Sequence, residues 1–69
     1  MNLHAVSMTV SDALGFIEAQ TAEQPTLARA NLRRLAERIG EIDHTRAEWN
    51  RYTAAARALG YTDAQIANL

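Results

Sequence analysis

Residues 28–59 read ARANLRRLAERIGEIDHTRAEWNRYTAAARAL, and this stretch decides the fold. Its apolar residues recur at steps of three, four or seven: Ala28, Leu32, Leu35, Ile39, Ile42, Trp49, Tyr52, Ala56 and Leu59. That spacing places them on one face of an α-helix. The stripe contains the only tryptophan of the chain and one of its two tyrosines. The sequence therefore predicts a helical protein in which something must cover this face.

Gly40 interrupts the stripe and leaves two interpretations open. In the first, one helix runs over residues 26–59, roughly 50 Å at 1.5 Å per residue, and the glycine costs it about 1 kcal/mol relative to alanine. In the second, Gly40 is a C-terminal cap, and Thr45 with Glu48 forms the capping box of a new helix. We favour the continuous helix, because the apolar stripe keeps its phase across Gly40.

A first helix is predicted over residues 9–24, before the central stretch. Thr9 or Ser11 caps its N-terminus. Pro25 ends it, because proline disfavours the α-conformation of the residue before it. The short connection to the next helix favours an antiparallel helical hairpin. Residues 1–8 are expected to be irregular.

A short last helix is predicted over residues 62–69. Gly60 suits a left-handed cap that ends the central helix, and Thr62 with Gln65 matches the capping-box pattern. We therefore expect a single all-α domain over residues 1–69. Its architecture is a helical hairpin with one long central helix and a short C-terminal helix.

The size and charge of the chain restrict what it can be. It has 69 residues, no cysteine and a formal net charge of −1. A core this small rarely supplies more than about 3–5 kcal/mol, so small domains often add disulfides, a metal or self-association. Self-association is the device that remains, and we expect a homodimeric bundle with a second copy as partner. The near-zero charge argues against a nonspecific nucleic-acid coat.

No segment indicates a membrane or export. No apolar run approaches the roughly 18 residues of a membrane span. Residues 1–10 lack the basic region and apolar block of a signal peptide. We therefore expect a cytoplasmic protein.

Trp49, Tyr52 and Arg46 are the candidate protein-binding residues. Trp49 and Tyr52 lie three residues apart on one helical face, and Arg46 lies near that face. Tryptophan, tyrosine and arginine are the residue types that most often carry interface energy. The alternative is that the two aromatic residues anchor the core of the domain or of its homodimer. The residues assigned to that core or dimer face are Leu32, Leu35, Ile39, Ile42 and Leu59.

Basic residues cluster early in the central stretch, at Arg29, Arg33, Arg34 and Arg38. One interpretation is a set of phosphate contacts, because the guanidinium fork suits such groups. The interpretation we favour is a solvated face on which Glu37 and Glu41 balance the arginines. Each such pair is worth only about 0.2–0.5 kcal/mol.

Catalytic and metal motifs are weak in this sequence. Glu41 and His44 have the Glu-x-x-His spacing of carboxylate metal sites on helices, but such sites need a second copy of the motif facing the first. No histidine is placed to suggest a catalytic triad. A helical chain of this size also encloses little volume for a substrate. We therefore expect no enzyme activity, no metal and no cofactor.

Two resemblances bear on function. Residues 58–67, ALGYTDAQIA, resemble the opening of a helix-turn-helix unit, in which a recognition helix then reads the major groove. No such helix follows here, so we expect no DNA binding by that route. The whole chain resembles the small helical proteins with which bacteriophages disarm their hosts, including the anti-quorum-sensing and anti-CRISPR types. That resemblance implies stoichiometric binding that covers a functional surface of a host regulator or motor.

The predicted function is a non-enzymatic module that inhibits or regulates a bacterial host protein by binding it. A nucleic-acid-associated transcriptional regulator is the first alternative. A purely structural subunit that assembles only with itself is the second.

Overall fold

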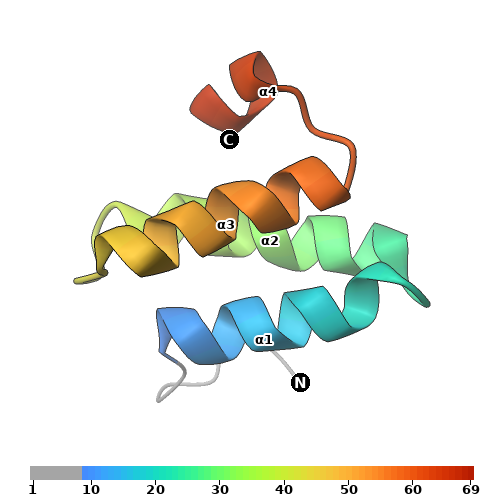
Figure 1. Ribbon diagram of the computed structural model, residues 1–69, viewed down its shortest axis with the longest axis horizontal. Coiled ribbons are helices and arrows are strands. Elements are labelled where there is room, and N and C mark those ends of the chain that lie inside the picture. Colours follow the sequence, from blue (N-terminus) through green and yellow to red (C-terminus); the bar gives the residue numbers. More distant parts are fainter. Residues whose placement is uncertain (1–8) are drawn as a thin grey trace.

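The computed structural model describes residues 9–69, and the regular structure in that range is entirely helical (Figure 1). The helices are α1 (Val10–Thr21), α2 (Pro25–Ile39), α3 (Arg46–Ala58) and α4 (Asp63–Ala67). The predicted all-α class is confirmed for this range. The segment expected to be irregular, residues 1–8, lies outside the described residues. Within the described range, none of the helices is both long and apolar enough to cross a membrane.

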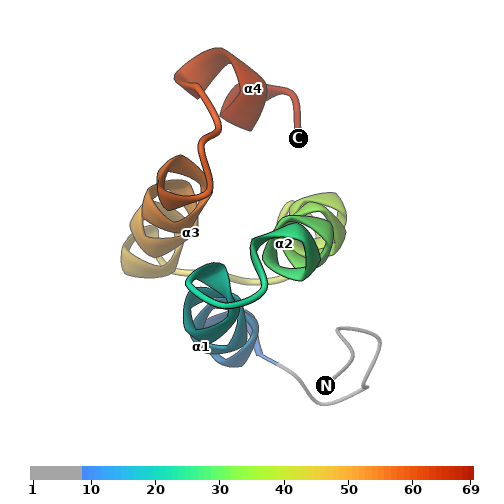
Figure 2. The same ribbon diagram turned by 90° about the vertical axis from the view of Figure 1, so that its right-hand side faces the viewer.

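The three long helices form three sides of a bundle. Successive helices run in opposite directions, and α1 packs along both α2 and α3 (Figure 1). In the end-on view, α4 lies over the remaining side, between α2 and α3 (Figure 2). The buried apolar core is built from Val10, Ala13, Leu14, Ile17, Ala28, Leu32, Leu35, Ile39, Tyr52, Ala55, Ala56 and Leu59.

The continuous helix that we expected over residues 26–59 is wrong, because α2 ends at Ile39 and α3 begins at Arg46. Two reciprocal hydrogen bonds fix the start of α3. The Glu48 backbone N–H donates to the Thr45 hydroxyl at 3.1 Å, and the Thr45 N–H donates to the Glu48 carboxylate at 2.9 Å. This capping box satisfies backbone donors that every helix start leaves open. The second interpretation of the sequence is therefore the correct one.

The break lets the second half of the apolar stripe fold back onto the first. Tyr52 and Ala56 of α3 and its C-cap residue Leu59 enter the same core as Leu32 and Leu35 of α2. A straight helix would leave them exposed, and burial contributes about 25 cal/mol per Å² of apolar surface. The helical spacing of the apolar residues continues across Gly40 because those of α2 and those of α3 face the same core. The chain therefore covers most of the stripe itself.

Gly40 and Gly60 end their helices in different ways. Gly40 is the C-cap of α2 in a right-handed conformation, with φ −71°, so it supplies no left-handed turn. Gly60 follows α3 with φ 94°, which confirms the left-handed turn predicted there. Thr62 then caps α4 in a capping box with Gln65, as predicted. The segment that resembles a helix-turn-helix opening is thus the end of α3, a turn and α4.

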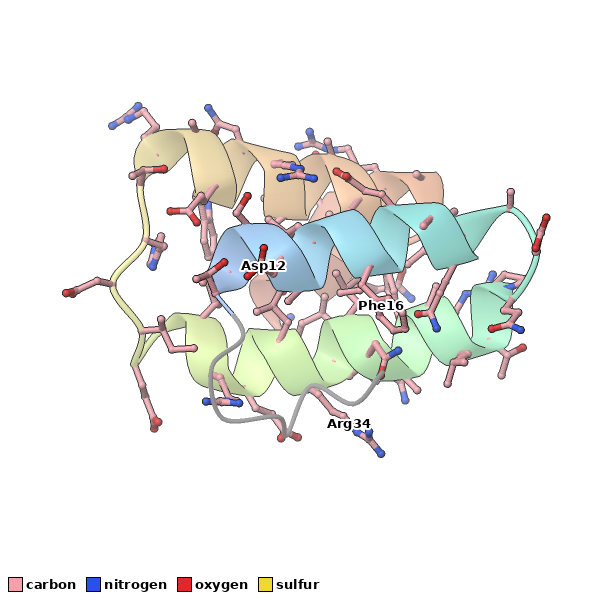
Figure 3. The ribbon with its side chains drawn as sticks, turned by 90° about the horizontal axis from the view of Figure 1, so that it is seen from below. Asp12, Phe16 and Arg34 are labelled. Carbon is pink, nitrogen blue, oxygen red and sulfur yellow. The ribbon has the colours of Figure 1, made fainter. Side chains whose placement is uncertain are left out.

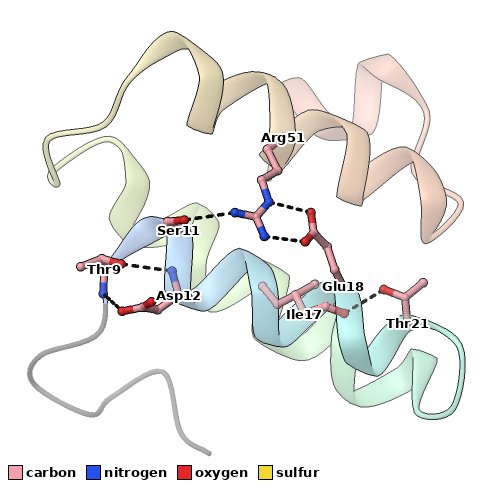
Figure 4. Close-up of polar contacts among 7 residues, drawn as sticks. All are labelled: Thr9, Ser11, Asp12, Ile17, Glu18, Thr21 and Arg51. Atoms are coloured by element: carbon pink, nitrogen blue, oxygen red, sulfur yellow. Dashed lines mark hydrogen bonds and ion pairs between the residues drawn. The ribbon is translucent and has the colours of Figure 1, made fainter.

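A surface ion pair joins α1 to α3, as Figure 4 shows. Arg51 Nε donates to Glu18 Oε2 at 2.8 Å, and Nη2 donates to Oε1 at 2.6 Å. Arg51 Nη1 also donates to the Ser11 hydroxyl at 3.1 Å. The hydrogen bond from Arg51 lowers the pKa of Glu18 from its usual 4.5; desolvation opposes this shift, and the Arg51 charge adds to it.

Glu18→Gln is expected to make the protein less sensitive to acid. A carboxylate whose pKa is lowered in the folded state stabilises that state above its unfolded pKa. The stabilisation is lost as the pH falls through the folded value. Wild type should therefore lose more stability than Glu18→Gln as the pH falls from neutrality through 4.5. The difference is small, because the two side chains are 39% and 42% exposed. Thermal unfolding at a series of pH values measures it, and parallel curves for the two proteins would contradict the prediction.

Candidate functional site

Trp49 and Tyr52 have opposite environments although they are one turn apart on α3. The Trp49 side chain is 41% exposed, whereas Tyr52 is 2% exposed. Their ring centroids lie 5.2 Å apart, with the planes tilted by 38°. Burial raises the pKa of Tyr52, and the nearby Tyr61 adds to the shift. Tyr52 is therefore a core residue on which Trp49 rests, and it reaches the surface only as part of the groove lining, so Trp49 is the exposed ring of the predicted partner contact.

His44 contacts Trp49 from a second side. Because Thr45 is the N-cap, His44 and Trp49 hold the two positions whose side chains commonly pack as a hydrophobic staple. Their ring centroids are 5.8 Å apart. His44 Nδ1 lies 3.0 Å from the Ile42 carbonyl oxygen, which only accepts, so Nδ1 carries the proton and donates. The contact of His44 with Trp49 is not among the predictions from the sequence. The Thr45-x-x-Glu48 capping box marks Thr45 as the N-cap, and that assignment would have placed His44 and Trp49 at the two staple positions.

An apolar groove of about 340 Å³ opens beside Trp49, between α2 and α3 and bordered by α4. Its lining residues are Ala36, Ile39, Trp49, Tyr52, Arg57, Asp63, Ile66, Ala67 and Leu69. The two charged residues among them neutralise each other, because Arg57 Nε donates to Asp63 Oδ1 at 3.1 Å. The groove therefore offers an apolar surface with a paired charge at one wall.

A second hollow, of about 480 Å³, adjoins the groove on the other side of Trp49. It is lined by His44, Arg46, Trp49 and Asn50. Arg46 is the charged group among these, and none of the carboxylates of residues 9–69 lines the hollow. The Glu48 carboxylate, two residues along α3, is turned back to the Thr45 N–H. Trp49 is thus a wall shared by an apolar groove and a polar hollow, and Arg46 lies beside it.

The residues assigned to a core or dimer face lie inside one chain. Leu32, Leu35, Ile39 and Leu59 are each at most 4% exposed and belong to the core of the bundle. Ile42, in the link between α2 and α3, is partly buried against that core. These five residues therefore need no second copy to cover them.

The arginine cluster of α2 is exposed along that helix, at Arg29, Arg33, Arg34 and Arg38. Arg29 Nε donates to the Leu59 carbonyl oxygen at 3.1 Å, which ties α2 to the end of α3. Arg34 points away from α1 (Figure 3). The same view places Phe16 where α1 and α2 meet. A phosphate surface on α2 would therefore lack Arg29, whose guanidinium already serves the fold.

The Glu-x-x-His spacing of Glu41 and His44 is not placed on a helix. Both residues lie in the link between α2 and α3, so the spacing does not put them on one helical face. Across residues 9–69, no three His, Cys, Asp or Glu side chains gather in a way that could hold a metal ion.

Comparison with known proteins gives no relative for this chain. No family model, no curated protein and no solved structure matches it. Its function is therefore argued from the groove, the hollow and the tryptophan between them.

Proposed function

We propose that this chain is a non-enzymatic protein-binding module that inhibits or regulates its partner by stoichiometric binding. The observation that carries the proposal is Trp49, an exposed tryptophan that contacts the rings of His44 and Tyr52 at the edge of an apolar groove. Tryptophan is among the residue types most enriched at binding hot spots. A side chain that is already held loses little rotamer freedom on binding, so more of its contact energy appears as affinity.

The proposed partner is a bacterial host protein in the cytoplasm. This part of the proposal rests on the resemblance to small phage proteins that disarm their hosts. A stoichiometric inhibitor needs only a surface that covers a functional part of its target. Trp49, Arg46 and the apolar groove supply such a surface without any catalytic group.

Trp49→Ala is expected to weaken partner binding by about 2 kcal/mol or more, roughly 30-fold in Kd. Wild type, Trp49→Ala and Leu27→Ala would each be tagged and used to capture proteins from bacterial lysate, with identification by mass spectrometry. The Kd values would then be measured with the purified partner. Leu27 is the matched control, because it is a large apolar side chain that is 46% exposed on α2.

A partner retained by wild type and Leu27→Ala, and lost with Trp49→Ala, supports the proposal. Equal retention by all three proteins contradicts it. Capture of nucleic acid alone also contradicts it. Such material would be removed by nuclease, and its binding would weaken steeply as the salt concentration rises. That result would move the function to nucleic acid, because phosphate contacts release counterions.

A further inference from the structure

The fourth side of the bundle is only partly covered. The helices α2 and α3 have 15 and 13 residues, whereas α4, which lies between them, has five (Figure 2). At 1.5 Å per residue, α3 is about 20 Å long and α4 about 7.5 Å. Because α4 is shorter than α3 by about 12 Å, which is about two turns, it leaves part of α3, the uncovered strip, with no helix of residues 9–69 over it.

The uncovered strip lies toward the N-terminal end of α3. Asp63, at the start of α4, is bonded to Arg57 near the C-terminal end of α3. From there α4 runs obliquely, back toward the N-terminal end of α3 (Figure 1) and across toward α2 (Figure 2), and Leu69 lines the same groove as Trp49 and Ile39. The strip beyond Leu69 is thus the part of the groove walled by Ile39 and Trp49.

The charged side chain beside this strip is that of Arg46, which is positive. The hollow past Trp49 is lined by Arg46 with His44 and Asn50, and no acidic side chain of the described part of the chain lines it. The guanidinium fork of arginine binds a carboxylate through two hydrogen bonds. A partner that reaches past Trp49 would therefore gain from an Asp or Glu at that end.

From this geometry we infer that the groove takes an amphipathic helix of another protein, seated beside the C-terminal end of α4 over the uncovered part of α3. About two turns of it contact the groove. Apolar residues at helical spacing fill the space beside Trp49 and Ile39, as in other helix-in-groove complexes. An acidic residue at one end pairs with Arg46. This inference rests on the proposed function and names the kind of partner segment that the site recognises.

A displayed library of peptides provides the probe. The peptides would be about 15 residues long, which is enough to form a helix, with varied apolar and charged positions on an alanine background. Selection on wild type should enrich helices that carry apolar residues three and four apart and one Asp or Glu. Selection on Arg46→Glu should enrich Lys or Arg at that same position. The selected acidic peptide should bind Arg46→Glu at least about tenfold more weakly than wild type.

Three controls make the outcome decisive. Arg33→Glu, the same charge change on α2 outside the groove and the hollow, should bind the acidic peptide within about twofold of wild type. A Glu→Lys change in the peptide should restore its affinity for Arg46→Glu. A proline placed in the middle of the peptide should abolish binding, because it breaks a helix.

The possible failures are distinguishable. Peptides that require Trp49 but tolerate the proline, or show no charge preference at Arg46, overturn the acidic helix and leave the protein-binding function standing. A library with no peptide that requires Trp49 overturns the use of this groove altogether. Sedimentation showing a dimer of wild type that Trp49→Ala dissociates would make the occupant a second copy and would also overturn the inference.

Discussion

Tyr52→Ala is expected to abolish folding, whereas Trp49→Ala, one turn away, should leave the fold intact. Tyr52 is 2% exposed and is among the largest fully buried side chains of the chain. Truncation of a buried aromatic side chain to alanine costs about 3–5 kcal/mol. A core of this size rarely supplies more than about 3–5 kcal/mol in total. Trp49 is 41% exposed, so its truncation removes mainly surface contacts.

Circular dichroism and urea denaturation of the two variants measure this difference. Tyr52→Phe is the matched control, because it keeps the buried ring and removes only the hydroxyl group. It should fold and lose far less stability than Tyr52→Ala. If Tyr52→Ala has the same unfolding midpoint as wild type, Tyr52 is not a core residue. It would then lie at the surface, where it could contact a partner.

Leu32→Ala is the second large effect, an expected loss of about 2–5 kcal/mol in the free energy of unfolding. Leu32 is 0% exposed in the core of the bundle. The loss should not depend on protein concentration, because the residues that cover Leu32 belong to the same chain. A side chain buried only in a dimer would give a stability that rises with concentration.

Urea denaturation at two protein concentrations about a hundredfold apart separates these cases. The control is Leu27→Ala, the same substitution on the same helix at an exposed position. Its effect should be within about 0.5 kcal/mol. A wild-type midpoint that rises with concentration, together with a Leu32→Ala defect confined to dilute protein, would place Leu32 at a dimer face instead.

Helix ends were the features most accessible to sequence reasoning. Thr9 caps α1, Thr62 caps α4, and Gly60 makes the left-handed turn that ends α3, all as predicted. Each of these depends on groups no more than a few residues apart, so the residue types carry the information. The residues of the core could likewise be predicted, because the helical period of Leu32, Leu35 and their neighbours marks a face that must be covered.

Some contacts could not be predicted from local spacing. Asn31 Nδ2 on α2 donates to Gln20 Oε1 on α1 at 2.8 Å, and both side chains are buried. Neither residue is marked as a core position by its chemical type, since amides are mostly exposed. The pair forms only because α1 and α2 align these positions, so that the buried Asn31 amide N–H meets the Gln20 amide oxygen across the interface.

The sequence alone determined that residues 9–69 are helical, where α1, α2 and α4 begin, that Gly60 follows α3, and which face is apolar; it placed the end of α1 at residue 24 rather than at Thr21. It did not determine whether the helix breaks at Gly40. The free energy that a glycine costs a continuous helix and the free energy that an N-cap gives a new helix are each only about 1 kcal/mol. The tertiary structure decided that question, because the break lets α3 bury its apolar face against α1 and α2. The same packing decided that Tyr52 is covered and Trp49 is not. Both residues lie on the same apolar stripe of α3. The positions of the other helices decide which part of that stripe is buried.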